Sequence, residues 1–216
     1  MSLLSITHKR ELPVLLWGFL ISFLGSLPPG TTNVLTVQLA ATKGYDTAIW
    51  FSLGCMIAEV ICVSVCVAVM DRLRNLPAVM KSLQWLSLLL ILWLVVSLFI
   101  KPEVPIPHTL PAIVFGFLLM IINPVQLPFW FGWTTILIER KILKVNSSAS
   151  VQYIIGIALG SIAASAIFIA GGHAITGWMS GKEKLIQWTF GSAFLVIAII
   201  QITKILRPKV DQLPDR

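Results

Sequence analysis

A single acidic residue lies in the middle of a long apolar segment. Glu59 is the only charged residue between positions 47 and 70. A carboxylate at the centre of a bilayer costs roughly 2.5–3.5 kcal/mol on insertion scales. That depth favours the neutral, protonated form, which makes proton exchange near neutral pH accessible. The functional interpretation is a proton-coupling group or a counter-charge for a cationic substrate, and the structural alternative is a protonated carboxyl group hydrogen-bonded to a neighbouring helix.

A polar run interrupts the first apolar segment. It reads Pro28-Pro29-Gly30-Thr31-Thr32-Asn33. Proline removes a backbone donor and clashes with the preceding turn, so the run predicts two half-helices joined by non-helical backbone. The start of the second half-helix would favour a substrate carboxylate through its positive end. The candidate substrate-binding residues are Pro29, Gly30, Thr31, Thr32 and Asn33; the alternative is a plain proline kink whose polar residues cap the freed backbone.

A second break offers further polar groups. Asn123-Pro124 interrupts the fourth apolar segment, and Pro128 follows soon after. Asn123, Pro124 and Gln126 are the candidate binding residues here, since amide side chains donate and accept hydrogen bonds without the cost of a charge. No Ser-His-Asp arrangement, phosphate-binding glycine loop or metal-spaced cluster occurs in the sequence. We therefore expect no enzyme activity, no catalytic or metal-ligating residues and no cofactor.

All three cysteines, Cys55, Cys62 and Cys66, belong to the second apolar segment. At about 100° per residue they lie close to one stripe of a helix, which indicates packing residues at a helix interface. A membrane thiol–disulfide carrier is an alternative function, but it would need cysteines on two different spans. Residues 55 and 62 are two helical turns apart, too far to form a disulfide.

The composition predicts the elements that must position these residues. The chain is 57% hydrophobic and 12% charged, about half the charged fraction of a soluble domain. Apolar segments near the roughly 20 residues needed to cross a bilayer recur along it. We expect an all-α membrane protein with six transmembrane helices, of which the first and fourth are broken near the midplane. The predicted spans are 12–41, 47–70, 83–101, 109–138, 151–171 and 185–204.

The placement of the two breaks predicts an internal repeat. Each break falls in the first of three spans, which suggests repeats over about 12–101 and 109–204. Residues 52–58 also resemble residues 158–164, aligning Gly54 with Gly160. Because three spans is an odd number, the second copy must be inverted in the membrane. An inverted 3+3 repeat with broken first helices predicts a transporter with its site near the midplane, built as one transmembrane domain over residues 1–216.

The basic residues predict an orientation. Of the 16 Lys and Arg residues, 12 fall in the N-terminus, the loops after spans 2 and 4, and the C-terminal tail. By the positive-inside rule both termini, including a short tail over 205–216, are cytoplasmic. This distribution accounts for the net charge of +7 without a nucleic-acid partner. A basic stretch, His8-Lys9-Arg10, precedes the first span, and no small-residue cleavage site follows it before the apolar run continues for 30 residues. We therefore expect a retained first helix instead of a removed signal peptide.

The residues around both breaks and Glu59 resemble the LysE/RhtB family of amino-acid exporters. The family's Pro-Gly-Pro-x-Asn is matched by Pro29-Gly30-Thr31-Thr32-Asn33, with Thr31 replacing the second proline. Its Gly-x-x-x-Gly-Asp is matched by residues 54–59, with Glu59 as the acid, and its Asn-Pro-Lys by Asn123-Pro124-Val125, without the lysine. Losing this lysine alters the charge balance of the site. Many members also place basic residues in the loop after span 3, which would oppose the orientation above.

The resemblance implies export of amino acids or related small metabolites across a bacterial inner membrane, driven by protons. The expected partners are a small-molecule substrate, protons and the lipid bilayer, with a homo-oligomer left open. Export of metal or other inorganic ions is an alternative, allowed by the unpaired Glu59 and disfavoured by the absence of His/Asp clusters. A membrane scaffold that transports nothing is a further alternative.

Overall fold

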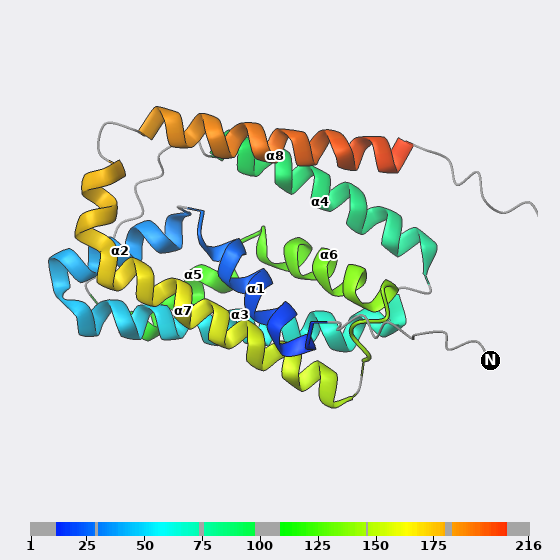
Figure 1. Ribbon diagram of the computed structural model, residues 1–216, viewed down its shortest axis with the longest axis horizontal. Helices are drawn as coiled ribbons and strands as arrows, with labels where there is room; N and C mark the ends of the chain where they lie inside the picture. The colour runs from blue at the N-terminus through cyan, green and yellow to red at the C-terminus, as the bar shows by residue number, and fades with distance from the viewer. Residues whose placement is uncertain are drawn as a thin grey trace, which may run out of the picture.

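The computed structural model describes residues 12–28, 30–73, 76–97, 109–145, 147–179 and 183–206, and every regular element within them is an α-helix. Figure 1 shows how these helices are arranged. The helices are α1 (Val14–Ser26), α2 (Thr31–Lys43), α3 (Tyr45–Leu73), α4 (Pro77–Ser97), α5 (Ala112–Ile121), α6 (Gln126–Glu139), α7 (Ser148–Met179) and α8 (Glu183–Leu206).

The helices follow the predicted spans. Among the described residues, α3 over Tyr45–Met70 and α7 over Ser148–Gly172 are each long and apolar enough to cross a membrane. The pairs α1–α2 and α5–α6 each qualify as one further span, so the described residues hold two to four candidate spans. The all-helical prediction is confirmed, whereas the count of six spans and the inverted repeat stay predictions. The expected N-terminal stretch and the tail over 207–216 lie outside the described residues.

Both predicted breaks are sharp bends. The α1 and α2 axes differ by 74°, and the α5 and α6 axes by 66°. The first bend follows from Pro28, whose missing N–H and bulky ring end α1 at Ser26. Asn123-Pro124 has the same effect between α5 and α6. Pro128 lies in the first turn of α6, where its missing donor does no harm because the first N–H groups of a helix lack partners in any case.

Glycines bring the first half of each broken helix against a long helix of the other half of the chain. Gly18 of α1 packs on the backbone carbonyl of Tyr153 in α7, and Gly116 of α5 packs on that of Phe51 in α3. Any side chain at either glycine would collide with that oxygen. Gly54 meets Ile113 in the same way. The closest helix pairs are accordingly α1 with α7 and α3 with α5, an arrangement typical of small residues at membrane helix interfaces.

These contacts define how the two halves correspond. Gly156 of α7 packs on Leu15 and Phe19 of α1 in the way that Gly54 of α3 packs on Ile113 and Phe117 of α5. Gly160 contacts Phe19 and Phe23 of α1 in the same way, so the register depends on the reciprocal contacts: Gly116 lies on Phe51, three residues before Gly54, and Gly18 lies on Tyr153, three residues before Gly156. These contacts favour Gly54 with Gly156, one helical turn from the alignment with Gly160 that the sequence suggested.

The remaining helices enclose this centre. Helices α4 and α8 run side by side along the upper edge of Figure 1. Helices α3 and α7 contact one another, α2 contacts both of them, and α6 contacts α3 and α4. The outward side of α3 is apolar, with Ile57, Ile61, Val65 and Val69 exposed. Such an apolar outer stripe on a helix with an acid on its inner side fits a bilayer environment.

Candidate functional site

The first break is organised by Asn33. Its side-chain amide donates to the backbone carbonyl oxygens of Ser26 and, at 3.0 Å, Pro28. The backbone N–H of Gly30 donates to the same Pro28 oxygen at 2.8 Å. These carbonyl oxygens lack their helical backbone N–H partners because the prolines end α1. The Asn33 side chain supplies a donor in their place. Pro29 lies outside the described residues.

The start of α2 keeps the feature that favours an anion. Gly30 is its extended N-cap residue, and no side chain caps this end. The N–H groups of the first turn, which includes Thr31 and Thr32, point along the positive end of the helix dipole. Thr31 is exposed and Thr32 is half-buried, so this end of α2 is accessible to a carboxylate.

The second break uses its polar groups locally as well. The Asn123 Oδ1 atom accepts from the backbone N–H of Val125 at 3.1 Å, which forms a tight turn beside the exposed Pro124. Gln126 accepts through Oε1 from the indole N–H of Trp130 at 2.9 Å, and its amide nitrogen contacts Met120 Sδ. Gln126 thereby holds the fully buried Trp130 in place.

The two breaks are neighbours. A Cβ atom on Gly25, at the end of α1, would lie 2.8 Å from the Phe129 ring in the first turn of α6. The aromatic ring therefore closes against the backbone just before the first break. The two breaks therefore come together at this contact, where the Phe129 ring packs against Gly25.

Glu59 lies elsewhere, between α1, α3 and α7. Its side chain is 4% exposed, and it is the one buried Asp, Glu, Lys, Arg or His among the side chains that the structure describes. The hydroxyls of Ser161 and Ser22 lie beside the carboxyl group, yet Oε2 and the Ser22 hydroxyl have no hydrogen-bond partner. The Glu59 carboxyl group therefore lies beside two hydroxyl groups, and no buried cation is found among the described residues.

The structure separates the predicted residues into two groups. Asn33 belongs to the first break, and Asn123 and Gln126 to the second; within the described part, no hydrogen bond joins either break to Glu59. The hydroxyls near the acid were not predicted from the sequence. These are Ser22, Thr134, Tyr153 and Ser161. Shifting the internal alignment by one turn would have found Ser161, because it then falls on Glu59.

The cysteines are packing residues in this structure. All three are free thiols buried on α3, and the Cys55 thiol contacts the backbone oxygen of Gly116 at 3.4 Å. They lie on a single helix, as the sequence indicated, so none faces a cysteine on another span.

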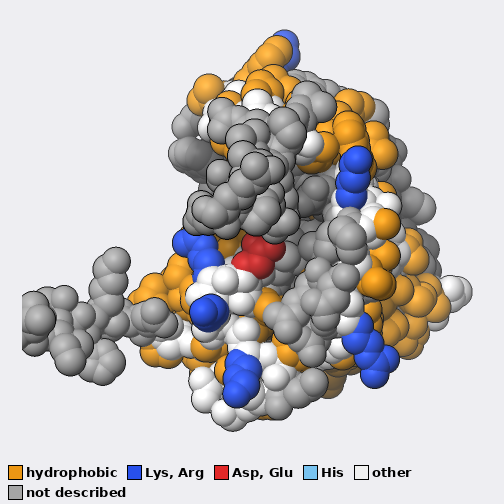
Figure 2. All heavy atoms as spheres, turned by 90° about the vertical axis from the view of Figure 1, so that its right-hand side faces the viewer, with side chains coloured by type: hydrophobic (Ala, Val, Ile, Leu, Met, Phe, Trp, Pro, Cys, Tyr) orange, Lys and Arg blue, Asp and Glu red, His pale blue; other side chains and the backbone are white. Residues whose placement is uncertain are grey.

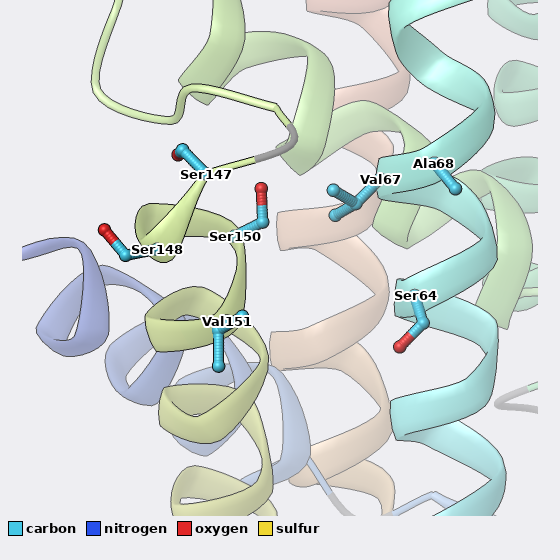
Figure 3. Close-up of a pocket in the computed structure, with 7 residues that line it drawn as sticks. All are labelled: Ser64, Val67, Ala68, Ser147, Ser148, Ser150 and Val151. Atoms are coloured by element: carbon cyan, nitrogen blue, oxygen red, sulfur yellow. The ribbon is translucent and has the colours of Figure 1, made fainter.

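Two cavities lie away from both groups. One of about 440 Å³ opens between α3 and the start of α7 (Figure 3), lined by Ser64, Val67, Ala68, Ser147, Ser148, Ser150 and Val151. Several of its hydroxyls are already engaged with backbone: Ser64 donates to Val60, and Ser150 to Lys144. The other, of about 510 Å³, is lined by Asp46, Thr47, Trp50, Pro111, Ala112 and Ile113. Neither contains a predicted binding residue, and neither is lined by Glu59.

The residues at the two bends and the buried Glu59 are those that carried the resemblance to exporters. The family model described as LysE type translocator matches residues 23–204. The chain belongs to the LysE type translocator family. The match includes both breaks and Glu59. It also includes three of the four hydroxyl residues near the acid, Thr134, Tyr153 and Ser161. LysE translocators are transporters and not enzymes, and family membership implies export of small molecules such as amino acids. Comparisons with curated proteins and with solved structures give no match.

Proposed function

We propose that this LysE translocator is a proton-coupled exporter of amino acids or related small metabolites in the bacterial inner membrane. The observation that carries the proposal is Glu59, a buried acid with an unpartnered oxygen and no cationic neighbour, in a translocator with two bent helices. A buried carboxylate without a cation is expensive, so the group is expected to hold a proton. It can lose that proton only when the site opens to water or a cation arrives.

The cross-paired helices support an inverted 3+3 repeat with six spans. Each half contributes a bent pair, a long apolar helix and a further helix, and the contacts of α1 with α7 are repeated by α5 with α3. Helices α4 and α8, with 21 and 24 residues, are long enough to supply the fifth and sixth spans. Two copies related in this way can exchange conformations across the membrane, which is how such repeats give alternating access.

Binding of the substrate carboxylate belongs to the breaks in this proposal. The uncapped start of α2 offers backbone N–H groups at Thr31 and Thr32. Asn33, Asn123 and Gln126 hold this backbone in shape through the hydrogen bonds described above, so they position the site through the backbone. Opening requires the Phe129 ring to leave Gly25.

The charges at one end of the molecule support cytoplasmic termini. Basic residues gather where α3 ends, α4 begins and α6 ends, and Figure 2 shows several of them around a hollow on that face. The described basic residues of these segments are Arg72, Lys81, Arg140, Lys141 and Lys144. Because Thr135 of α6 donates to Met70 of α3 at 3.3 Å, the two helix ends belong to the same side, which the positive-inside rule assigns to the cytoplasm.

The test uses the reconstituted protein in vesicles loaded with pooled labelled amino acids. A pH gradient should drive flux by the wild-type protein, and Glu59→Gln should abolish gradient-driven flux while the protein still inserts. Glu139→Gln is the matched control, since it makes the same change at an exposed acid at the end of α6. Undiminished gradient-driven flux in Glu59→Gln would remove Glu59 from the mechanism, and absence of flux for every pooled compound in the wild type would overturn the proposal.

A further inference from the structure

The described core contains five buried side-chain oxygens without hydrogen-bond partners. They belong to Ser22, Ser52, Glu59, Thr134 and Tyr153. Each unpaired buried polar group costs free energy, so proteins keep few of them without a reason. Five within a small membrane core therefore call for a ligand, water or a second conformation that pairs them.

Four of the five oxygens lie in two neighbouring groups around Glu59. The Ser22 and Ser161 hydroxyls lie beside the Glu59 carboxyl group, and the Tyr153 hydroxyl lies beside Thr134 within electrostatic reach of Glu59. Ser22 packs against the turn of α7 that carries Ser161. The Cβ atom of Ser22 lies 3.0 Å from the position that a Cβ atom would take on Gly160, the residue before Ser161. We refer to the two groups together as the cluster, which joins α1, α3, α6 and α7.

The negative charge and the acceptor oxygens around Glu59 favour a ligand that is a cation with several hydrogen-bond donors. Its one acid is Glu59, and the titratable groups that face it or Tyr153 are the thiols of Cys55, Cys62 and Cys66. Every polar atom of the cluster can accept a hydrogen bond, and no described cation donates to it. A proton on Glu59 neutralises the charge but adds only one donor for the surrounding hydroxyls. An ammonium group, with three donors and one positive charge, can bind the carboxylate and two hydroxyls together.

The cluster also lies on a boundary that can move. Glycine packing ties α1 to α7 and α3 to α5 through close backbone contacts. Ser22, Tyr153 and Ser161 belong to the first pair and Glu59 to the second. Sliding of one pair against the other would therefore open the cluster without breaking either close-packed pair, whereas in the described conformation neither cavity reaches it.

We propose that Ser22, Thr134, Tyr153 and Ser161 form with Glu59 a chamber that binds the ammonium group of the exported compound. The proposal rests on the export function above and names its substrate class: compounds that carry a protonated primary amine. Binding exchanges one cation for another, since the ammonium group enters as the Glu59 carboxyl group releases its proton to water. The ammonium group and the proton therefore compete for the Glu59 carboxylate. This competition couples export of the amine to entry of the proton.

The first experiment measures proton release by the purified full-length protein in weakly buffered detergent with a pH-sensitive dye. Three pools are added: amino acids, their amides, and the matching 2-hydroxy acids. Amino acids and amides should release about one proton for each molecule bound, as linkage between the two equilibria requires. The hydroxy acids, which lack the amine, should release none. Proton release by the hydroxy acids equal to that by the amino acids, or none with any amine, would overturn the proposal.

The second experiment separates binding from folding. Tyr153→Phe and Ser161→Ala should each weaken binding of the amide pool roughly tenfold or more, because each removes an acceptor for a charged donor. The melting temperature of Tyr153→Phe should stay the same or rise, since the lost hydroxyl had no partner. Ser52→Ala is the matched control: it removes a buried, unpartnered hydroxyl from α3 two turns before Glu59, and amide affinity should not change. Equal losses at Ser52 and Ser161 would contradict the chamber.

The two proposals fail in different ways. Flux of hydroxy acids equal to that of amino acids, with Glu59-dependent proton coupling, would keep the exporter and overturn the ammonium chamber. Amine binding with proton release, but without flux of any compound in vesicles, would keep the chamber and overturn export.

Discussion

Glu59 of α3 faces Ser161 of α7, and the two residues occupy equivalent positions when the halves are matched through Gly54 and Gly156. Residues that are related by an approximate two-fold axis and also touch one another must lie close to that axis. In the proposed inverted repeat, the acid therefore lies near the centre about which the two halves would exchange conformations. A proton or cation bound there acts on both halves at once.

This equivalence predicts the result of moving the acid across the axis. Glu59→Ser should abolish proton-driven flux, and adding Ser161→Glu should restore it to at least roughly tenfold above the single variant, because the carboxyl group returns to the same chamber from the facing helix. Vesicle flux under a pH gradient measures this. Ser165→Glu, one turn further along α7, serves as the control for an acid in the wrong register. Equal recovery by both acids would contradict the matching of the halves.

The glycine contacts predict that replacing glycine by alanine changes stability by an amount that depends on the position. Gly116→Ala and Gly54→Ala should each lower the free energy of unfolding by about 1–3 kcal/mol, because the new methyl group meets a backbone carbonyl that cannot move alone. At Gly132 nothing lies within 4 Å of the Cβ position, so Gly132→Ala should be neutral or stabilise by up to about 1 kcal/mol through helix propensity. Unfolding by denaturing detergent compares the three variants, and a loss at Gly132 equal to that at Gly116 would argue against the packing described.

The hydrogen bonds of Asn33 predict a structural contribution at the first break. Asn33→Ala should destabilise the protein by about 1–3 kcal/mol, because two backbone carbonyls near the proline break lose their donor. Gln38→Ala changes an exposed amide on the same helix and should have little effect. Thermal unfolding in detergent measures both. Unchanged stability in Asn33→Ala, together with lost substrate binding, would assign Asn33 to the ligand instead of the backbone.

Two adjacent threonines predict opposite responses to the same change. Thr134 is fully buried with an unpartnered hydroxyl, so Thr134→Val should leave stability unchanged or raise it by about 1 kcal/mol while weakening amine binding. Thr135 donates to the Phe131 carbonyl at 2.6 Å and to Met70 Sδ. We expect Thr135→Val to lower stability by roughly 0.5–1.5 kcal/mol and to spare binding. Melting curves and amide titrations on both variants make the comparison; matching behaviour at the two positions would count against a chamber at Thr134.

Local chemistry made much of the architecture predictable. Long apolar segments, prolines that cannot continue a helix and an acid in mid-segment are properties of short stretches of chain, so the helices, both bends and the buried position of Glu59 followed from the sequence. The family resemblance rested on the same stretches and was confirmed over residues 23–204. The polar residues at the breaks were also found, with their capping role among the alternatives considered.

Tertiary structure decided which faces of those helices meet. The internal alignment differed by one turn because small residues recur every four positions, and only the reciprocal glycine contacts favour one register. Ser22, Thr134, Tyr153 and Ser161 are unremarkable in their own segments, since serine, threonine and tyrosine are common in membrane helices. Their hydroxyls become notable only when four helices enclose them around one carboxyl group, because the cost of an unpaired polar atom depends on its surroundings and not on its place in the chain.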